Sequence, residues 1–269
     1  MNATESAARR RFDPAAARER IAAARLRLGS PLAYQLETTS TNDDALAAAR
    51  AGAPHGACFV AEQQTRGRGR RGRSWHSEPG DDLTFSLLLR PSLRADQASG
   101  LSLVAGLSVR AAAASRVPGP TLVKWPNDVV AAGRKLSGVL VESQIQAGEL
   151  GAVVVGIGVN VARQRFDEAQ APRATSLSLL GAVDLDREGL LADVLAELER
   201  RLGAYEIAGL RGLLDELREF DALAGRAVRV DGVDGLACGI DDSGRLLVRD
   251  ATGQLQALLT GTVEIPEEP

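Results

Sequence analysis

The chain has 269 residues, which is enough to bury a full hydrophobic core and, we expect, to form one large domain and one small one. Its 45% hydrophobic and 25% charged residues are typical of a globular protein, and its formal net charge of −3 argues against a general nucleic-acid binder. The two distant cysteines fit no metal or redox motif, and the lack of a secretory signal or a bilayer-spanning apolar run predicts a cytoplasmic protein.

Helical and strand-like patterns alternate through the first 120 residues. Residues 14–28 are rich in Ala and Arg and are predicted to form a helix. A second helix should begin at Thr41, which can cap it, with Asp44 three residues on as in a capping box. Two strands and an apolar core helix are then expected at residues 57–62, 83–89 and 101–115.

The rest of the chain divides into a mixed region and a strand-rich region. Strands are predicted at residues 121–125, 136–143 and 151–161, and helices at 186–203 and 209–220. The turn-like residues 147–149 make the second and third of these strands an antiparallel hairpin. Four or five short strands after Gly225 predict a small SH3-like barrel, at residues 227–230, 236–240, 246–249 and 254–259. The expected division is a lead-in (1–30), an α+β domain (31–221) and a small all-β domain (222–269).

Residues 66–73 carry five arginines and three glycines and are the most informative segment of the chain. Five guanidinium groups repel one another unless a polyanion lies among them, and glycine allows the backbone to approach a ligand closely. The segment also matches the dinucleotide pattern G-x-G-x-x-G, but a loop and a strand follow it rather than the required helix. A solvated surface loop and a nucleic-acid clamp, in which Arg grips phosphates and Trp75 stacks a base, remain alternatives at this point.

Two further segments place polar residues where predicted strands begin or end. Residues 123–129 end a strand at Trp125, after which Pro126 stops the ladder and Asn127 and Asp128 project from a turn. Residues 134–142 place Lys135 at the start of an apolar strand. Each segment alone is explained by an ordinary turn or by a solvated lysine, so it is their joint occurrence that indicates a site.

In order and spacing, these three segments resemble the motifs of the biotin protein ligases. The resemblance extends to residues 40–42 and 156–160, and it covers residues 31–265. Lipoate ligases share the fold but lack the arginine–glycine run. The resemblance implies an α+β fold of the class II aminoacyl-tRNA synthetase and biotin protein ligase type, with a mixed, mainly antiparallel sheet, flanking helices and a small C-terminal SH3-like β-barrel.

The resemblance also implies an activity. Members of this family join biotin to ATP, release pyrophosphate, and pass biotin from biotinoyl-5′-AMP to a lysine of a biotin carboxyl carrier protein or domain, here expected to belong to an acetyl-CoA-type carboxylase. A lipoate or octanoate ligase of the same fold is the alternative within the enzyme class. Residues 1–30 lack the pattern of the winged helix with which some members bind DNA, so we expect no DNA partner, no membrane partner, and either a monomer or a homodimer.

The resemblance assigns expected roles to individual residues. Those expected at biotin are Ser40, Thr41, Asn42, Gln64, Arg68, Gly69, Arg70 and Lys135, of which Arg68, Arg70 and Lys135 are the expected catalytic residues. Those expected at the nucleotide are Arg70, Arg73, Trp75, Asn127 and Asn160. Asp128 is expected to help hold Mg²⁺ beside the phosphates. The arginine–glycine segment is expected to be mobile when empty and to be ordered by ligand.

Overall fold

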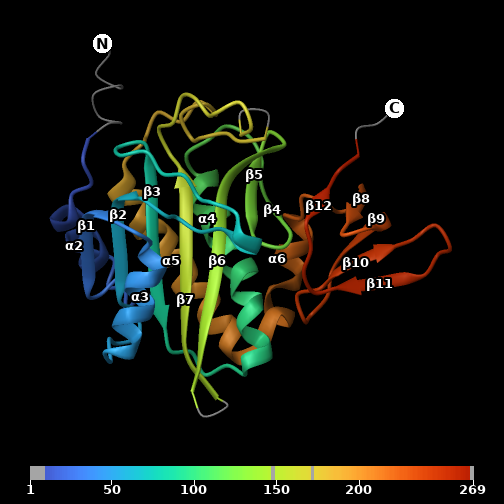
Figure 1. Ribbon diagram of the computed structural model, residues 1–269, viewed down its shortest axis with the longest axis horizontal. Coiled ribbons are helices and arrows are strands. Elements are labelled where there is room, and N and C mark those ends of the chain that lie inside the picture. Colours follow the sequence, from blue (N-terminus) through green and yellow to red (C-terminus); the bar gives the residue numbers. More distant parts are fainter. Residues whose placement is uncertain (1–9, 147–148, 171–172, 267–269) are drawn as a thin grey trace.

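The computed structural model describes residues 10–146, 149–170 and 173–266, which form a large mixed sheet with helices on both faces and a small antiparallel sheet beside it (Figure 1). The elements of the larger part are α2 (Pro14–Ala23), β1 (Leu32–Thr38), α3 (Thr41–Arg50), β2 (Cys58–Gln64), η1 (Arg70–Gly72), β3 (Asp82–Leu89), η2 (Ala95–Gly100), α4 (Leu101–Ala114), β4 (Thr121–Lys124), β5 (Asp128–Ala131), β6 (Arg134–Gln146), β7 (Glu149–Asn160), α5 (Arg187–Ala208), η3 (Gly209–Leu213) and α6 (Leu214–Glu219). The small sheet consists of β8 (Ala227–Val230), β9 (Val233–Ile240), β10 (Leu246–Arg249), β11 (Leu255–Leu258) and β12 (Val263–Glu264).

The main sheet contains seven strands in the order β1-β2-β3-β7-β6-β5-β4. β1 and β2 are parallel, and the other neighbouring pairs are antiparallel. The predicted mixed, mainly antiparallel sheet is therefore confirmed, as is the β6–β7 hairpin, whose turn residues 147–148 lie outside the described residues. The sequence patterns missed β1, a half-exposed edge strand, and β5, which begins directly after the turn at Pro126 and Asn127.

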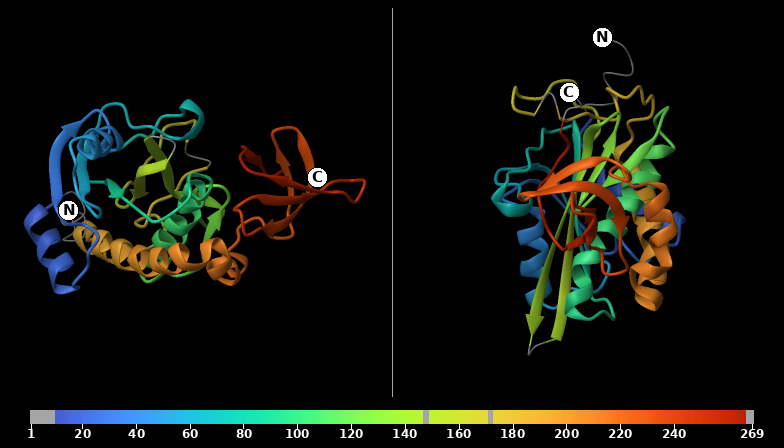
Figure 2. Two further views of the ribbon diagram at one scale, coloured as in Figure 1. Left: turned by 90° about the horizontal axis from the view of Figure 1, so that it is seen from below. Right: turned by 90° about the vertical axis from the view of Figure 1, so that its right-hand side faces the viewer.

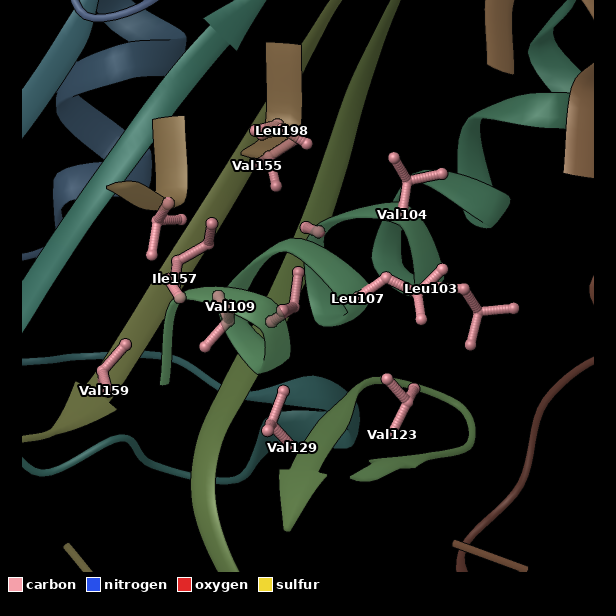
Figure 3. Packing of buried hydrophobic residues seen from close by; sticks show 14 of the residues in the cluster. Leu103, Val104, Leu107, Val109, Val123, Val129, Val155, Ile157, Val159 and Leu198 are labelled. Carbon is pink, nitrogen blue, oxygen red and sulfur yellow. The ribbon is translucent and has the colours of Figure 1, made fainter. Parts of the chain in front are cut away.

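One face of the main sheet is apolar and is covered by α4 and α5. Because successive side chains of a strand point to opposite faces, β7 directs Val155, Ile157 and Val159 to this side. Figure 3 shows them packed around α4 and below Leu198 of α5. The labelled α4 residues in this cluster are Leu103, Val104, Leu107 and Val109, and all are buried. The hydrophobic core of the larger part lies here.

The opposite face is covered only in part, by α3. Under α3, Leu88 and Val154 pack against Ala45 and Ala49. Beyond the start of α3, the same face of β3, β6 and β7 presents five small or hydroxyl-bearing residues, which are Thr84, Ser86, Gly138, Gly156 and Gly158. This region of the sheet is therefore left open for something other than the core.

The start of α3 differs from the sequence prediction. Ser40, rather than Thr41, occupies the N-cap position, and its side chain makes no capping hydrogen bond. The predicted capping box with Asp44 is therefore wrong. The Thr41 hydroxyl instead donates to Gln64 Oε1 at 3.1 Å, so this helix terminus is held by contacts that reach across to β2.

The lead-in helix packs on the body of the protein. α2 ends before the predicted residue 28 because Arg25 adopts a positive φ of 54°. Phe12, Ala17 and Ile21 are buried, and the backbone N–H of Asp13 donates to a carboxylate at the start of α5. The long helix α5 also differs from the prediction: it continues past residue 203 and ends at Ala208. The predicted helix at residues 209–220 is a 3-10 turn followed by α6.

The C-terminal sheet has the order β11-β10-β9-β8-β12 and lies at the opposite end of the molecule from α2 (Figure 2). It is the expected SH3-like antiparallel arrangement, but the described residues do not pair β11 with β12, so the predicted barrel is open. The buried indole of Trp125 joins the two parts by donating from Nε1 to the carbonyl of Gly244 at 2.9 Å. None of the helices in the described ranges is long and apolar enough to cross a membrane.

Candidate active site

The open part of the main sheet is the floor of a cavity. Across three strands, Gly138 is paired with Gly158 and Gly158 with Thr84, while Gly156 lies opposite Ser86. Glycine has no side chain, so this row leaves room above the backbone. The walls come from the start of α3, the arginine–glycine segment, the turn at residues 124–128 and residues 261–263 of the C-terminal part.

Two side chains lie directly against the glycine floor. A Cβ on Gly158 would come within 2.2 Å of Cε2 of Trp75, and a Cβ on Gly156 would come within 2.0 Å of Oδ1 of Asn42. Both distances are shorter than real contacts, so larger residues at these positions would displace the side chains above them. The glycines therefore determine how deeply Trp75 and Asn42 enter the cavity.

The end of the cavity at α3 is a network of uncharged polar groups. The backbone N–H of Thr41 donates to Gln64 Oε1 at 2.8 Å, and Ser86 Oγ lies 2.6 Å from Asn42 Oδ1. Ser40, Thr41 and Asn42 are all buried. Hydroxyl and amide groups both donate and accept hydrogen bonds, so this end is suited to a neutral ligand with several polar atoms, such as a ureido ring.

Arg68 is held by protein carboxylates. Its guanidinium donates to Asp43 Oδ1 at 2.7 Å and to Glu142 Oε2 at 2.8 Å. Glu142 also accepts from Asn42 Nδ2 at 2.7 Å, so this carboxylate of β6 links the arginine–glycine segment to the first turn of α3. Among the expected catalytic arginines, Arg68 is thus the one whose charge the protein itself neutralises.

The other arginines of the segment contact the C-terminal part. Arg70 donates to Thr260 Oγ1 at 2.6 Å, Arg71 to Asp231 Oδ1 at 2.8 Å, and Arg73 to Thr262 Oγ1 at 2.7 Å. Burial, with the nearby charge of Arg71, lowers the pKa of Arg70. In this structure the segment thus bridges the two parts of the protein over the cavity.

Lys135 and Arg70 reach adjacent residues of one turn. Lys135 Nζ lies 2.7 Å from Asp128 Oδ1 and 5.8 Å from the ring centre of Trp75. Arg70 donates to Asn127 Oδ1 at 3.3 Å, and Asn127 is itself fixed because its Nδ2 donates to the carbonyl of Val139 at 2.7 Å. Two cations from distant segments therefore approach the same turn in the wall of the cavity.

Asn160 is the one expected site residue that does not line this cavity. It is buried, and its Nδ2 donates to the carbonyl of Thr175 at 2.8 Å. Thr175 in turn donates its backbone N–H to the carbonyl of Lys135 at 2.8 Å. Asn160 thus supports the strand that carries Lys135, and its direct contact with a nucleotide stays a prediction. All the other expected site residues line the cavity.

Several cavity residues escaped the sequence analysis. Lys124 lies within the 123–129 motif but was given no role, and Thr84 and Leu140 alternate with core residues on their strands. The alternation of polar and apolar residues in β3 could have predicted that Thr84 faces the cavity, because Thr84 pairs with Gly158 of β7. No sequence pattern predicts the contacts of Asp231 and Thr262 with the arginine–glycine segment, because the residues are far apart in the chain and meet only in the folded protein.

Comparisons with known proteins agree with this geometry. Residues 32–160 match the Biotin/lipoate A/B protein ligase family, and residues 225–265 match the Biotin protein ligase C terminal domain. The chain is 38% identical to the biotin–acetyl-CoA-carboxylase ligase of Mycobacterium tuberculosis, over 84% of this chain and 86% of that protein. It is 37% identical to the ligase of the same name from Paracoccus denitrificans, over 81% of this chain and 93% of that protein.

The fold has similar solved structures. The biotin protein ligase from Aquifex aeolicus, in complex with biotin and ATP, superposes with a TM-score of 0.76 at 30% identity, covering 89% of this chain and 100% of that chain. The Bifunctional ligase/repressor BirA of Bacillus subtilis is 32% identical over 88% of this chain but only 75% of its own length. The similarity therefore includes both the main sheet and the C-terminal sheet.

Proposed function

The chain belongs to the biotin protein ligase family, and we propose that it activates biotin with ATP and transfers it to a carrier protein. The observation that carries this proposal is the division of one cavity into two ends. Uncharged polar groups around Thr41 and Gln64 lie at one end, and Arg70 and Lys135 meet at the other. That arrangement suits a ligand with a neutral polar head and an acid group that reacts beside a phosphate.

The chemistry requires cations rather than a protein nucleophile. A carboxylate oxygen of biotin attacks the α-phosphorus of ATP, the bond to the bridging oxygen breaks, and pyrophosphate leaves with the electron pair. The neutral amine of a carrier lysine then attacks the biotinoyl carbonyl carbon, the bond to the AMP oxygen breaks, AMP leaves with that electron pair, and the nitrogen loses a proton to solvent. Arg70 and Lys135 are placed to stabilise the charge that develops at the α-phosphate.

The remaining residues have binding roles in this proposal. Ser40, Thr41, Asn42 and Gln64 contact the biotin head, and the backbone at Gly69 lies over its carboxylate. Trp75 and Asn127 contact the adenosine, and Arg73 contacts a phosphate. The support is that all of these residues line the same cavity as Lys135. Closing the arginine–glycine segment would also keep water from the labile acyl-adenylate.

Asp128 is the carboxylate available to a magnesium ion in this cavity. It already pairs with Lys135, and the described residues contain no group of three or more His, Cys, Asp or Glu that could hold a metal by themselves. Mg²⁺ is usually held by one or two carboxylates together with substrate phosphates, so a single carboxylate fits an ion that arrives with ATP. Mg²⁺ would reduce the negative charge of the phosphates there.

The carrier is expected to be the biotin carboxyl carrier protein or domain of an acetyl-CoA-type carboxylase. The support is the name shared by the relatives from M. tuberculosis and P. denitrificans. A cytoplasmic location, action without DNA, and a monomeric or homodimeric state also belong to the proposal. The two free cysteines of the described chain fit a reducing compartment.

Transfer of labelled biotin to a purified carrier domain, with ATP and Mg²⁺ present, tests the proposal directly. Label should appear on the carrier only when ATP is added. Lipoate and octanoate are the matched substrates for the alternative ligase, and pyrophosphate exchange with each acid ranks the three. Exchange with lipoate or octanoate but not with biotin would overturn the choice of substrate.

A nucleic-acid clamp is tested separately by filter binding at two salt concentrations. A clamp that neutralises several phosphates loses affinity steeply as salt rises. We expect no such salt-dependent binding for this chain. Tight, salt-sensitive binding combined with no biotin-dependent exchange would replace the ligase by the clamp.

A further inference from the structure

The cations around the cavity fall into two classes. Arg68, Arg71 and Lys135 each form an ion pair with a carboxylate of the protein. In the part of the chain that the structure describes, the other three cavity-lining cations on the same walls form none, and they are Arg70, Arg73 and Lys124. Charge that the protein leaves uncompensated is the charge available to an anionic ligand.

Lys124 is the member of the second class that the proposed function has not used. It is the last residue of β4, opposite Asp128 in the register of the β4–β5 pair, and it is half-buried. Its Nζ makes a single long hydrogen bond, 3.4 Å, to the carbonyl of Val263. Burial is the main cause of a lowered pKa at Lys124; the negative charge of Asp128 opposes the lowering, and the positive charge of Lys135 adds to it.

A half-buried ammonium group with one long hydrogen bond, near a carboxylate with which it forms no ion pair, is compensated only in part by the protein. The opposite charge of Asp128, its cross-strand neighbour, favours a lysine at the end of β4, but the two side chains form no ion pair in the part of the chain that the structure describes. The lysine side chain lines the cavity, next to Asp128 and Asn127. The position is therefore suited to an anion that is present only during the reaction.

The three uncompensated cations lie around one short segment of the C-terminal part. Arg70 contacts Thr260, Arg73 contacts Thr262 and Lys124 contacts Val263. This segment is at the other end of the cavity from the buried residues of α3 that are expected to hold biotin. Three positive charges in one place match an extended polyphosphate better than a single carboxylate.

We propose that Lys124 is a phosphate-binding residue of the activation reaction, which holds, with Arg73 and next to Arg70 at the α-phosphate, the two phosphates of ATP that leave as pyrophosphate. This rests on the proposed function. When the bond between the α-phosphorus and the bridging oxygen breaks, its electron pair stays with the pyrophosphate. An ammonium group beside that oxygen stabilises the growing charge, and Lys124 therefore acts on the leaving group while Lys135 acts at the α-phosphate.

The test is the pair Lys124→Gln and Lys124→Arg, compared by biotin-dependent pyrophosphate exchange at varied ATP and pyrophosphate. Lys124→Gln should raise the KM for ATP and for pyrophosphate about 10- to 100-fold, the effect of losing one charge-assisted hydrogen bond, and Lys124→Arg should restore most of it. Biotin affinity measured by calorimetry without ATP should be unchanged. Arg226→Gln is the matched control, because Arg226 is exposed, adds positive charge near Lys124 and does not line the cavity.

The outcomes separate this inference from the function it rests on. If the wild-type chain shows no biotin-dependent exchange, the proposed function fails. If the wild type is active and Lys124→Gln keeps wild-type KM values for both ATP and pyrophosphate, the inference fails alone. A fall in biotin affinity equal to the change in the KM for ATP would make Lys124 a structural residue of the cavity and would also overturn it.

Discussion

The two faces of the main sheet are built from the same strands, but one face carries large apolar side chains and the other carries glycines and small polar residues. On the face under α4, β7 contributes Val155, Ile157 and Val159, and the side chains fill the space between sheet and helix. On the other face the alternate residues are Gly156 and Gly158, and the space is left open. Adjacent residues of one strand thus serve packing and binding in turn.

Because the two faces differ in this way, a single substitution can change stability without changing ligand binding, or the reverse. A residue of the packed face is held by neighbours on all sides, so shortening it costs stability. A residue of the open face is adjacent to cavity, so enlarging it changes what the cavity can hold. We expect substitutions on the two faces to separate folding from activity.

The largest effect is expected at the cations of the open face. Lys135→Ala and Arg70→Ala should each slow adenylate formation about 10²- to 10³-fold, the scale of losing one preorganised donor at a developing charge. Pyrophosphate release under single-turnover conditions measures this step. Arg66→Ala is the control, because this exposed arginine of the same segment does not line the cavity. Normal release by both cavity variants would contradict the assigned roles.

The next effect concerns the packed face. Val159→Ala should lower the free energy of unfolding by about 1.5–3 kcal/mol, because Val159 is fully buried, does not line the cavity, and leaves a hole in the core when it is truncated. At a temperature where the variant is folded, its KM for biotin should stay close to that of the wild type. Denaturant unfolding and steady-state kinetics check the two parts. A large rise in KM without loss of stability would show that the faces are not separable.

The neighbouring residue should give the reverse result. Gly158→Ala adds a Cβ that would lie 2.2 Å from Cε2 of Trp75, so the indole must move. We expect about tenfold weaker ATP binding, or ~1.4 kcal/mol, since the indole is proposed to contact the adenosine. The free energy of unfolding should change by less than about 1 kcal/mol. Unchanged binding in calorimetry would mean that the floor tolerates a side chain.

A smaller effect is expected from ligand on the arginine–glycine segment. Trypsin cleaves after arginine, and residues 66–73 offer five sites. Biotin with ATP should slow cleavage there, because the phosphates compensate the repulsion among the guanidinium groups. Mass spectrometry of the fragments locates the cuts. Equal cleavage with and without the two ligands would contradict the prediction that ligand orders residues 66–73.

The smallest effect is expected at the contact between Arg71 and Asp231. The hydrogen bond from Arg71 lowers the pKa of Asp231 to about 2 from its ordinary 3.8. Because the folded value is the lower one, the contact is complete above pH 3.8 and is lost as the pH falls towards 2. Titration of the Asp231 carboxyl by NMR should show this midpoint, and Arg71→Ala should return it towards 3.8. An unshifted midpoint in the wild type would mean that the exposed pair does not form in solution.

Much of the fold and site could be predicted because the informative patterns are local. The alternation in β3 and β7 and the apolar spacing of α4 depend on neighbours within one element, and those elements were found. The motifs around Arg70, Asn127 and Lys135 were recognisable for the same reason. β1 was missed because an edge strand that is half exposed lacks a clear alternation.

What the sequence did not reveal depends on contacts between distant segments. Thr41 was expected to cap its own helix, but its hydroxyl reaches Gln64 on β2. The carboxylate partners of Arg68 come from α3 and β6, which only the sheet order brings together. The contact of Lys124 with Val263 likewise exists only once the C-terminal part is in place.

The protein has two tryptophans, and the fold gives them different surroundings. Both line the cavity, but only Trp125 is buried, and its indole bonds to Gly244 of the C-terminal part. The fluorescence of Trp125 in a Trp75→Phe variant therefore responds to separation of the two parts as well as to the cavity. With Trp125 replaced instead, the fluorescence of Trp75 reports on the cavity and the arginine–glycine segment alone. The difference between the two variants is an optical measure of how the two parts stay docked.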